Sequence, residues 1–126
     1  KDPEQEIARG NVAIFKKSVI GRVIETIDDK AKVMLLTDSK SRIPVISEVS
    51  RNRGILAGNN SSVMEIRYLA KNHGIVLGEM VYTSADGDQV PAGILVGIVT
   101  KISKNKVYVK MVEDISNIDR LTILQY

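Results

Sequence analysis

The sequence contains no cysteine and no tryptophan, and it has one phenylalanine and one histidine. Without cysteine the chain has no disulfide, no catalytic thiol and no cysteine-based zinc site. Aromatic residues make up only 4% of the chain. The core must therefore be built mostly from Ile, Val, Leu and Met, a composition that suits small β-barrels.

Long apolar segments are also missing. No window approaches the ~20 apolar residues that a membrane-spanning helix needs, and no secretory leader is recognisable. The chain as given is expected to be soluble. It begins at Lys1 without Met and runs through an acidic stretch, Asp2 to Glu6, straight into Ile7. This start resembles a cut from a longer protein, so an amino-terminal membrane anchor stays possible.

The charge balance is close to neutral, with 18 Lys and Arg against 15 Asp and Glu. A net charge of +3 does not by itself indicate nucleic-acid binding. Apolar residues at 44% and charged residues at 26% indicate a folded globular chain. A length of 126 residues is compatible with one domain or with two very small ones.

Strand signals recur about every ten residues. Met64, Ile66 and Tyr68 alternate with polar residues, as do Val107, Val109 and Met111, and this period of two is typical of half-buried strands. Helical periodicity is poor, apart from one possible turn at 114–119. Further strands are predicted at 12–15, 19–27, 33–36, 43–46, 76–83, 94–102 and 121–125. This spacing favours an all-β barrel or sandwich.

The stretch from Gly78 to Val99 is the most informative. Met80 to Thr83 favours extended backbone, residues 85–88 have turn chemistry, and Pro91 and Gly93 exclude a helix before the next strand. An internal similarity adds to this. Residues 19–38 align without gaps on 95–114, pairing Gly21 with Gly97 and Asp38 with Asp114. The shared pattern is a strand with an early glycine, a polar turn and a second strand, which makes two similar small barrels plausible.

Candidate catalytic and metal-binding residues are few. Ser84, His73 and Asp86 are the only conceivable hydrolase triad, but Ser84 lacks the glycine-flanked strand-to-helix elbow that a nucleophile of this kind needs. His73 beside Gly74 is interpreted as a solvated loop residue. The pairs Asp28-Asp29 and Asp86-x-Asp88 lack the loop of six or more oxygen ligands that calcium requires, so they are interpreted as turn formers. No catalytic residue, metal ligand or cofactor site is therefore predicted.

Two patterns of spacing have structural explanations. Gly54-x-x-x-Gly58 and Gly93-x-x-x-Gly97 occur without a Gly-Lys-Ser/Thr sequence or a long apolar helix, so bends and close strand crossings explain them better. A basic set has the potential to line a nucleic-acid groove, but the exposed aromatic residues that such a groove uses for stacking are scarce. The basic set comprises Arg51, Arg53, Arg67, Lys71, Lys101, Lys104, Lys106 and Lys110.

The segment 78–99 resembles the extracytoplasmic β-domain of the MreC family of bacterial rod-shape-determining proteins. Three short motifs add to the resemblance: Gly21-Arg22-Val23, Leu36-Thr37-Asp38 and the segment from Arg53 to Gly58. Ala85 and Val90 depart from the family pattern, in which Gly and Phe are common at these places. The residues matching the motifs are Gly21, Arg22, Val23, Thr37, Asp38, Gly54, Gly58, Gly78, Thr83, Ser84, Gly87, Pro91, Gly93 and Gly97.

The resemblance implies two small antiparallel β-barrels packed together, with little helix. The first is expected at residues 1–70, lacking its first strand or strands, and the second at 71–126, with the terminal strand able to pair back with the first. The resemblance further implies a non-enzymatic scaffold of the cell-elongation complex, on the periplasmic side of the inner membrane. The full-length protein would cross this membrane once.

The partners implied are further copies of itself, penicillin-binding protein 2, RodA, MreD and MreB, while the contacting residues stay unknown. The alternative function is a small basic β-barrel that binds nucleic acid.

Overall fold

The computed structural model describes residues 11–84 and 91–112, and the backbone of 122–124. The regular elements in these ranges are strands, and none is a helix. The all-β prediction is therefore confirmed. The strands are β1 (Val12–Phe15), β2 (Ser18–Ile27), β3 (Lys30–Leu35), β4 (Arg42–Ser47), β5 (Arg53–Ala57), β6 (Val63–Arg67), β7 (Met80–Thr83), β8 (Leu95–Ser103), β9 (Lys106–Lys110) and β10 (Thr122–Leu124).

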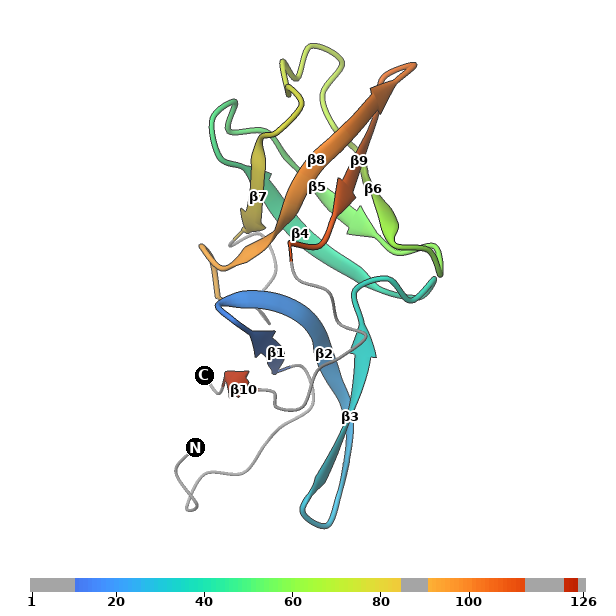
Figure 1. Cartoon of the computed structure of the whole chain (residues 1–126), viewed down its shortest axis with the longest axis vertical. Coiled ribbons are helices and arrows are strands. Elements are labelled where there is room, and N and C mark those ends of the chain that lie inside the picture. The colour runs from blue at the N-terminus through green and yellow to red at the C-terminus, as the bar shows by residue number, and fades with distance from the viewer. Residues whose placement is uncertain (1–10, 85–90, 113–121, 125–126) are drawn as a thin grey trace.

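Six strands close into a barrel, which forms the upper part of the molecule in Figure 1. The strand order is β7-β4-β5-β6-β9-β8, and β8 pairs with β7 to complete the circle. All six pairings are antiparallel. Closure removes the free strand edges of an open sheet, so the barrel forms a rigid frame for its loops. In the described ranges, no helical segment has the length and hydropathy needed to cross a bilayer.

The barrel interior is aliphatic. On β6 and β9, alternate residues point inward, so that Met64 and Ile66 meet Val107 and Val109, and all four are buried. The buried cluster continues through residues of β4, β5, β7 and β8, and none of its members in the described ranges is aromatic. This confirms the expected Ile, Val, Leu and Met core.

The other four strands form an antiparallel sheet below the barrel, in the order β10-β1-β2-β3. The chain thus returns from the barrel to pair β10 with β1. One parallel pair, Ser18 with Leu95, joins β2 to β8. Val12 and Val19 of the sheet belong to the same buried cluster as Val96 of the barrel, so one core runs through both parts.

The internal similarity corresponds to one hairpin that occurs twice. The hairpins β2–β3 and β8–β9 each turn over two residues. Their ladders shift register at equivalent points, after Val23 in the first and after Val99 in the second. The turn residues Asp28 and Lys104, also equivalent, both have positive φ angles, of 55° and 51°. The aligned sequences therefore encode the same backbone path.

The two matched glycines occupy the same environment in their hairpins. A Cβ on Gly21 would lie 2.3 Å from the carbonyl oxygen of Met34, and a Cβ on Gly97 would lie 2.5 Å from that of Lys110. Met34 and Lys110 are themselves matched in the alignment. Each hairpin therefore needs a glycine because the opposite strand approaches too closely for any side chain.

Most predicted strands overlap observed ones, although β3, predicted at 33–36, already begins at Lys30. β5 was missed, because the sequence Arg53 to Ala57 is short and contains a glycine. The strand predicted over 76–83 is extended only from Met80, because Gly78 has a φ of +84° and forms a turn. The helical turn considered at 114–119 lies outside the described residues.

How the chain divides into independently folding parts stays a prediction. Strands on both sides of residue 70 close the one barrel, so strand pairing favours a unit of about residues 38–112 over a boundary at 70. If the boundary lies at 70, pieces 1–70 and 71–126 fold when produced separately. We expect instead that neither piece unfolds cooperatively, because each would expose open β-strand edges. Thermal melts of the two pieces and of 38–112 distinguish these outcomes.

Candidate functional site

Glu79 lies just before β7 and joins two loops at one end of the barrel. Its Oε2 atom accepts hydrogen bonds from the Val49 N–H at 3.0 Å, the Ser50 N–H at 2.7 Å and the Ser50 hydroxyl at 2.8 Å. Its Oε1 atom accepts one from the Val76 N–H at 3.2 Å. Glu79 is only 4% exposed. One buried carboxylate thus fastens the β4–β5 loop (48–52) to the β6–β7 segment (68–79).

These hydrogen bonds also set the ionisation of Glu79. Burial raises its pKa, but the bonds from Ser50, Val76 and Val49 lower it by more, so the pKa lies below the ordinary value of 4.5. Donors that point at the carboxylate favour its charged form. The bridge between the loops therefore consists of an ionised group at neutral pH.

A second set of polar contacts stiffens the same loops. The side-chain amide of Asn52 donates to the carbonyl of His73, and the Asn52 N–H donates to the Ser47 hydroxyl at 3.0 Å. His73, predicted as a solvated loop residue, does lie in a loop but is half-buried. Its Nδ1 atom accepts the Ile75 N–H at 3.0 Å. The ring thus supports its own loop.

Exposed aliphatic side chains project from the two loops that Glu79 joins. Val49 is 74% exposed, Val76 58% and Leu77 63%. We call these three residues the apolar tip. Leu77 is exposed because a turn carries it outward: the Glu79 N–H donates to the Val76 carbonyl at 3.3 Å, and Gly78 has a φ of +84°. These values match a type II turn, which requires glycine or asparagine at its third position.

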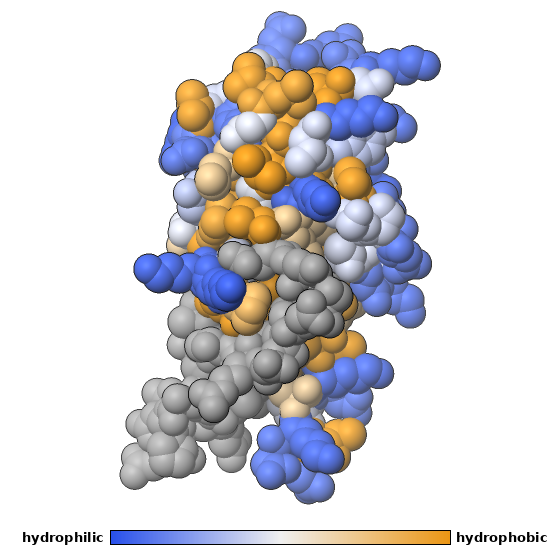
Figure 2. Space-filling view, in the orientation of Figure 1, coloured by the Kyte–Doolittle hydropathy of each residue, from blue (hydrophilic) through white to orange (hydrophobic). Residues whose placement is uncertain are grey.

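Apolar side chains also cover part of the outer wall of the barrel. Met80 and Tyr82 of β7, and Leu95 and Ile98 of β8, are half-buried on this wall. Figure 2 shows apolar side chains gathered over the upper half of the face on which β7 and β8 lie in Figure 1. The barrel therefore carries the apolar tip at one end and a partly apolar wall along β7 and β8.

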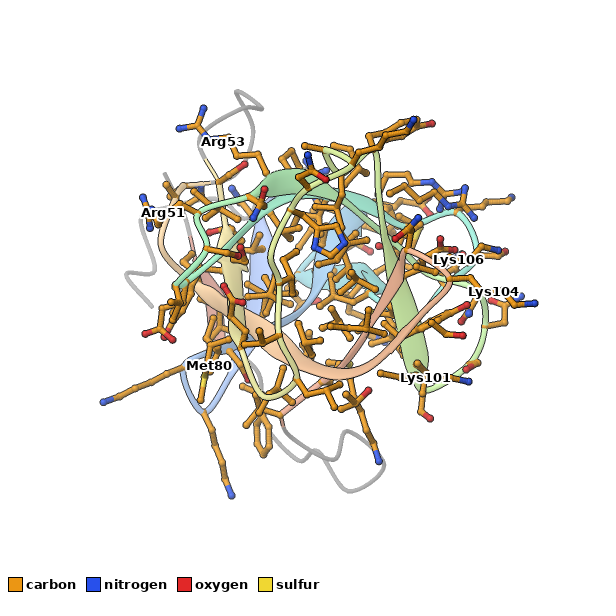
Figure 3. All side chains as sticks on the ribbon, turned by 90° about the horizontal axis from the view of Figure 1, so that it is seen from above. Arg51, Arg53, Met80, Lys101, Lys104 and Lys106 are labelled. Atoms are coloured by element: carbon orange, nitrogen blue, oxygen red, sulfur yellow. The ribbon has the colours of Figure 1, made fainter. Side chains whose placement is uncertain are left out.

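Basic residues lie on opposite sides of the barrel. Figure 3, which looks down on the barrel, shows one group of arginines on one side, a group of lysines on the other, and Met80 on the periphery apart from both. They do not gather into the single groove considered for nucleic acid. Lys101 also lies over the ring of Tyr108, with Nζ 5.7 Å from its centre. The labelled groups are Arg51 and Arg53, and Lys101, Lys104 and Lys106.

Two open depressions flank the loops. One, of about 360 Å³, lies between β4, β7 and the residues before β8, with Ile46, Glu48, Arg51, Arg53, Tyr82, Thr83, Ser84, Ala92 and Gly93 around it. The other, of about 240 Å³, is lined by residues 65–71, His73 and Asn105. The second depression shows that the β8–β9 turn lies beside the β6–β7 segment.

The residues considered for catalysis and metal binding are dispersed. Ser84 follows the end of β7, whereas His73 lies in the segment before its start, and Asp86 lies outside the described residues. Asp28 is in the β2–β3 turn, as expected for a turn former. Within residues 11–84 and 91–112, no group of three or more His, Cys, Asp or Glu side chains is placed to hold a metal ion.

The described motif residues are spread over the fold: several lie at turns and close approaches, whereas Arg22 and Val23 lie within β2. A Cβ on Gly58 would lie 2.1 Å from the Asp38 carbonyl oxygen, and Asp38 itself caps a turn by accepting the Lys40 N–H at 2.8 Å. Thr83 donates its hydroxyl to the Pro91 carbonyl at 2.7 Å, which ties the end of β7 to the residues before β8. Gly87 lies outside the described residues.

The sequence reasoning missed Glu79 and the apolar tip. The available indication was a lone glutamate between Gly78 and the apolar run Met80 to Tyr82. A glutamate is seldom buried, and one that is buried needs hydrogen-bond donors to stay charged. Its partners are 29 and 30 residues away in sequence, so local patterns do not reveal them.

The fold and the site define a class of protein: a rigid, closed β-barrel that presents fastened loops and an apolar end to its surroundings. Comparison with known families makes this specific. The chain belongs to the MreC family, because the family model described as "Rod shape-determining protein MreC, barrel core" matches residues 3–125.

Individual relatives agree with this assignment. The cell shape-determining protein MreC of Caulobacter vibrioides is 33% identical over 123 residues, which cover 98% of this chain and 36% of that protein. A structure described as the major periplasmic domain of the cell shape-determining filament MreC has a TM-score of 0.81 at 27% identity, covering 94% of this chain and 80% of that one. The chain spans about a third of the curated relative's length.

A third comparison concerns an assembly. The structure of a complex between penicillin-binding protein PBP2 and MreC from Helicobacter pylori contains a chain similar to this one, with a TM-score of 0.73 at 18% identity. The similarity covers 91% of this chain and 76% of that chain. At this level of identity the comparison shows a shared fold.

Proposed function

We propose that this chain acts as a non-enzymatic scaffold of the bacterial cell-elongation complex. It would maintain cell shape by associating with itself and by binding proteins of peptidoglycan synthesis. The observation that carries this proposal is the match of residues 3–125 to the barrel core of a rod shape-determining protein. The rigid barrel with its apolar end supports recognition, since such a frame holds a binding surface in one conformation.

The most direct partner we propose is penicillin-binding protein 2. A relative with the same fold is described in a complex with that protein. Binding would bias the conformational equilibrium of the transpeptidase to the extent that the scaffold prefers one of its states.

We further propose that the domain lies outside the inner membrane, as part of a longer protein anchored in that membrane. A relative's domain described as periplasmic supports this location. MreD, RodA and, through the membrane, MreB complete the proposed set of partners. These proposals concern the whole protein, of which a curated relative contains almost three times this length.

The test is a pulldown of membrane cell-wall synthesis proteins from the source bacterium with this chain as bait, together with light scattering of the purified chain. We expect the transpeptidase of the elongation complex among the captured proteins, and a mass above that of the monomer. Capture of oligonucleotides that weakens steeply with salt, and of no cell-wall protein, would favour the nucleic-acid alternative instead.

The purified chain is expected to show no hydrolytic turnover on ester, peptide or peptidoglycan substrates. The structural reason is that Ser84 and His73, the one histidine of the chain, line different depressions of the barrel, so Ser84 has no histidine base beside it. Turnover assays with the wild type and with Ser84→Ala check this. Activity that disappears in the Ser84→Ala variant would contradict the scaffold proposal.

A further inference from the structure

The end of the barrel that carries the apolar tip has the properties of a prepared binding surface. Burying a Val or Leu side chain is worth about 1.5–3 kcal/mol, yet Val49, Val76 and Leu77 all project into solvent. The Glu79 carboxylate and the turn at Gly78 hold the loops that carry them in place. Because the loops are already ordered, a partner would bind without the entropy cost of ordering them.

Two bulky residues at the same end adopt an uncommon backbone conformation. Arg51 has a φ of 58° and Tyr68 a φ of 66°, in the left-handed region that non-glycine residues seldom occupy. Arg51 is in the same loop as Val49, and Tyr68 begins the segment that carries Val76. Both are exposed, Tyr68 to 82%. Both lie in connections between strands, and Tyr and Arg are favoured as anchors in protein interfaces.

The surroundings of the tip are basic. The described barrel residues, 42–84 and 91–112, contain nine Lys and Arg but only three Asp and Glu. Of these acids, Glu79 is buried, Glu65 is half-buried and Glu48 is exposed. Lys71 lies in the β6–β7 segment, and Lys104 lies in the β8–β9 turn beside that segment. Three exposed cations, Arg51, Lys71 and Lys104, thus lie at the end of the barrel that carries the apolar tip, against one exposed acid there within these ranges, Glu48.

We propose that the apolar tip, together with Arg51 and Tyr68, is the docking surface for a protein partner whose matching surface is apolar and rimmed by acidic residues. This inference rests on the scaffold function proposed above and specifies the surface that performs it. A protein is favoured over a lipid surface because the loops that carry the few exposed aliphatic residues also carry an exposed tyrosine and an exposed arginine. That arrangement is typical of an interface core with a charged rim.

The experiment measures binding of the full chain to the purified periplasmic part of penicillin-binding protein 2 from the same bacterium. We expect Leu77→Asp and Val76→Asp each to weaken binding at least 30-fold without lowering the melting temperature. Ile27→Asp is the matched control: Ile27 is an aliphatic residue, 60% exposed, at the β2–β3 hairpin far from the tip. It should bind as the wild type does.

Two further measurements test the chemistry of the partner. Arg51→Glu and Lys71→Glu are expected to slow association and to reduce its dependence on salt, since the opposing rim is acidic. Vesicles containing phosphatidylglycerol test the lipid alternative. Binding of the chain to such vesicles that Leu77→Asp abolishes, with no effect of that variant on transpeptidase binding, would overturn the proposal.

The outcomes separate this inference from the function on which it rests. If the wild type and Leu77→Asp bind the transpeptidase equally, the scaffold function stands but the docking surface lies elsewhere. If the wild type binds neither the transpeptidase nor itself, both proposals are wrong. A loss of binding in the Ile27→Asp control equal to that in Leu77→Asp would also overturn the assignment, since the effect would then not be specific to the tip.

Discussion

Replacing Gly97 by valine is expected to prevent the chain from folding. A Cβ at this position would lie 2.5 Å from the carbonyl oxygen of Lys110 and 2.7 Å from Cγ1 of Val109. Both belong to β9, so relieving the overlap means breaking the β8–β9 ladder on which closure of the barrel depends. We expect a loss of more than about 4 kcal/mol in the free energy of unfolding, a large part of a typical domain's stability. Thermal melting and soluble yield measure this.

Two controls show whether the effect comes from crowding. Gly74 also lacks a side chain, but nothing lies within 4 Å of a Cβ there and its φ is +68°. Gly74→Ala should therefore cost only about 1–2 kcal/mol of backbone strain. His73→Ala removes one hydrogen-bond acceptor and should change stability by no more than about 1 kcal/mol. A melt in which His73→Ala is the more damaging change would contradict our account of both positions.

Replacing Glu79 by alanine is expected to destabilise the chain by about 3 kcal/mol. Four donors lose an ionised acceptor at once, and hydrogen bonds to charged groups are worth about 1.5–3 kcal/mol each before water and loop movement compensate. Urea unfolding of the two proteins measures the difference. Glu48→Ala is the matched control, because Glu48 is an exposed glutamate beside the same loop. It should change stability by less than about 0.5 kcal/mol.

The pH dependence follows from the same carboxylate. The folded pKa of Glu79 lies below 4.5, so its contribution to stability is fully present above the unfolded value and is lost as the pH falls through the folded one. We expect the stability difference between wild type and Glu79→Gln to be constant near neutral pH and to shrink below about pH 4.5. A difference that grew on acidification would show that the carboxylate is not held in its charged form.

Much of the fold was predictable because the relevant patterns are local. Alternation over 64–68 and 107–111 correctly located β6 and β9, and the alignment of 19–38 on 95–114 anticipated two matching hairpins. Side chains on successive strand residues face opposite ways, so a half-buried strand records its faces directly in its sequence. β5 was not predicted, because a strand of five residues that contains Gly54 shows too little alternation of apolar and polar residues to be recognised.

The surface was less predictable, for a physical reason. The sequence did not indicate that Arg51 and Arg53 lie on the opposite side of the barrel from Lys101, Lys104 and Lys106, since the side that a residue occupies depends on which strands become neighbours. The strand predicted over 76–83 ran through Gly78, so neither the turn at Gly78 nor the exposure of Leu77 that follows from it was anticipated. Such features follow from packing and not from propensity.

The amino-acid sequence by itself determined that this protein is built from strands with an aliphatic core. It also determined that Gly21 and Gly97 occupy equivalent places in a hairpin that occurs twice. These properties depend on residues close together along the chain. Only the tertiary structure decided that six strands close into one barrel, and that Glu79 reaches Ser50 across 29 positions. Closure and the fastening of loops depend on groups that are far apart until the chain folds. No local preference specifies them.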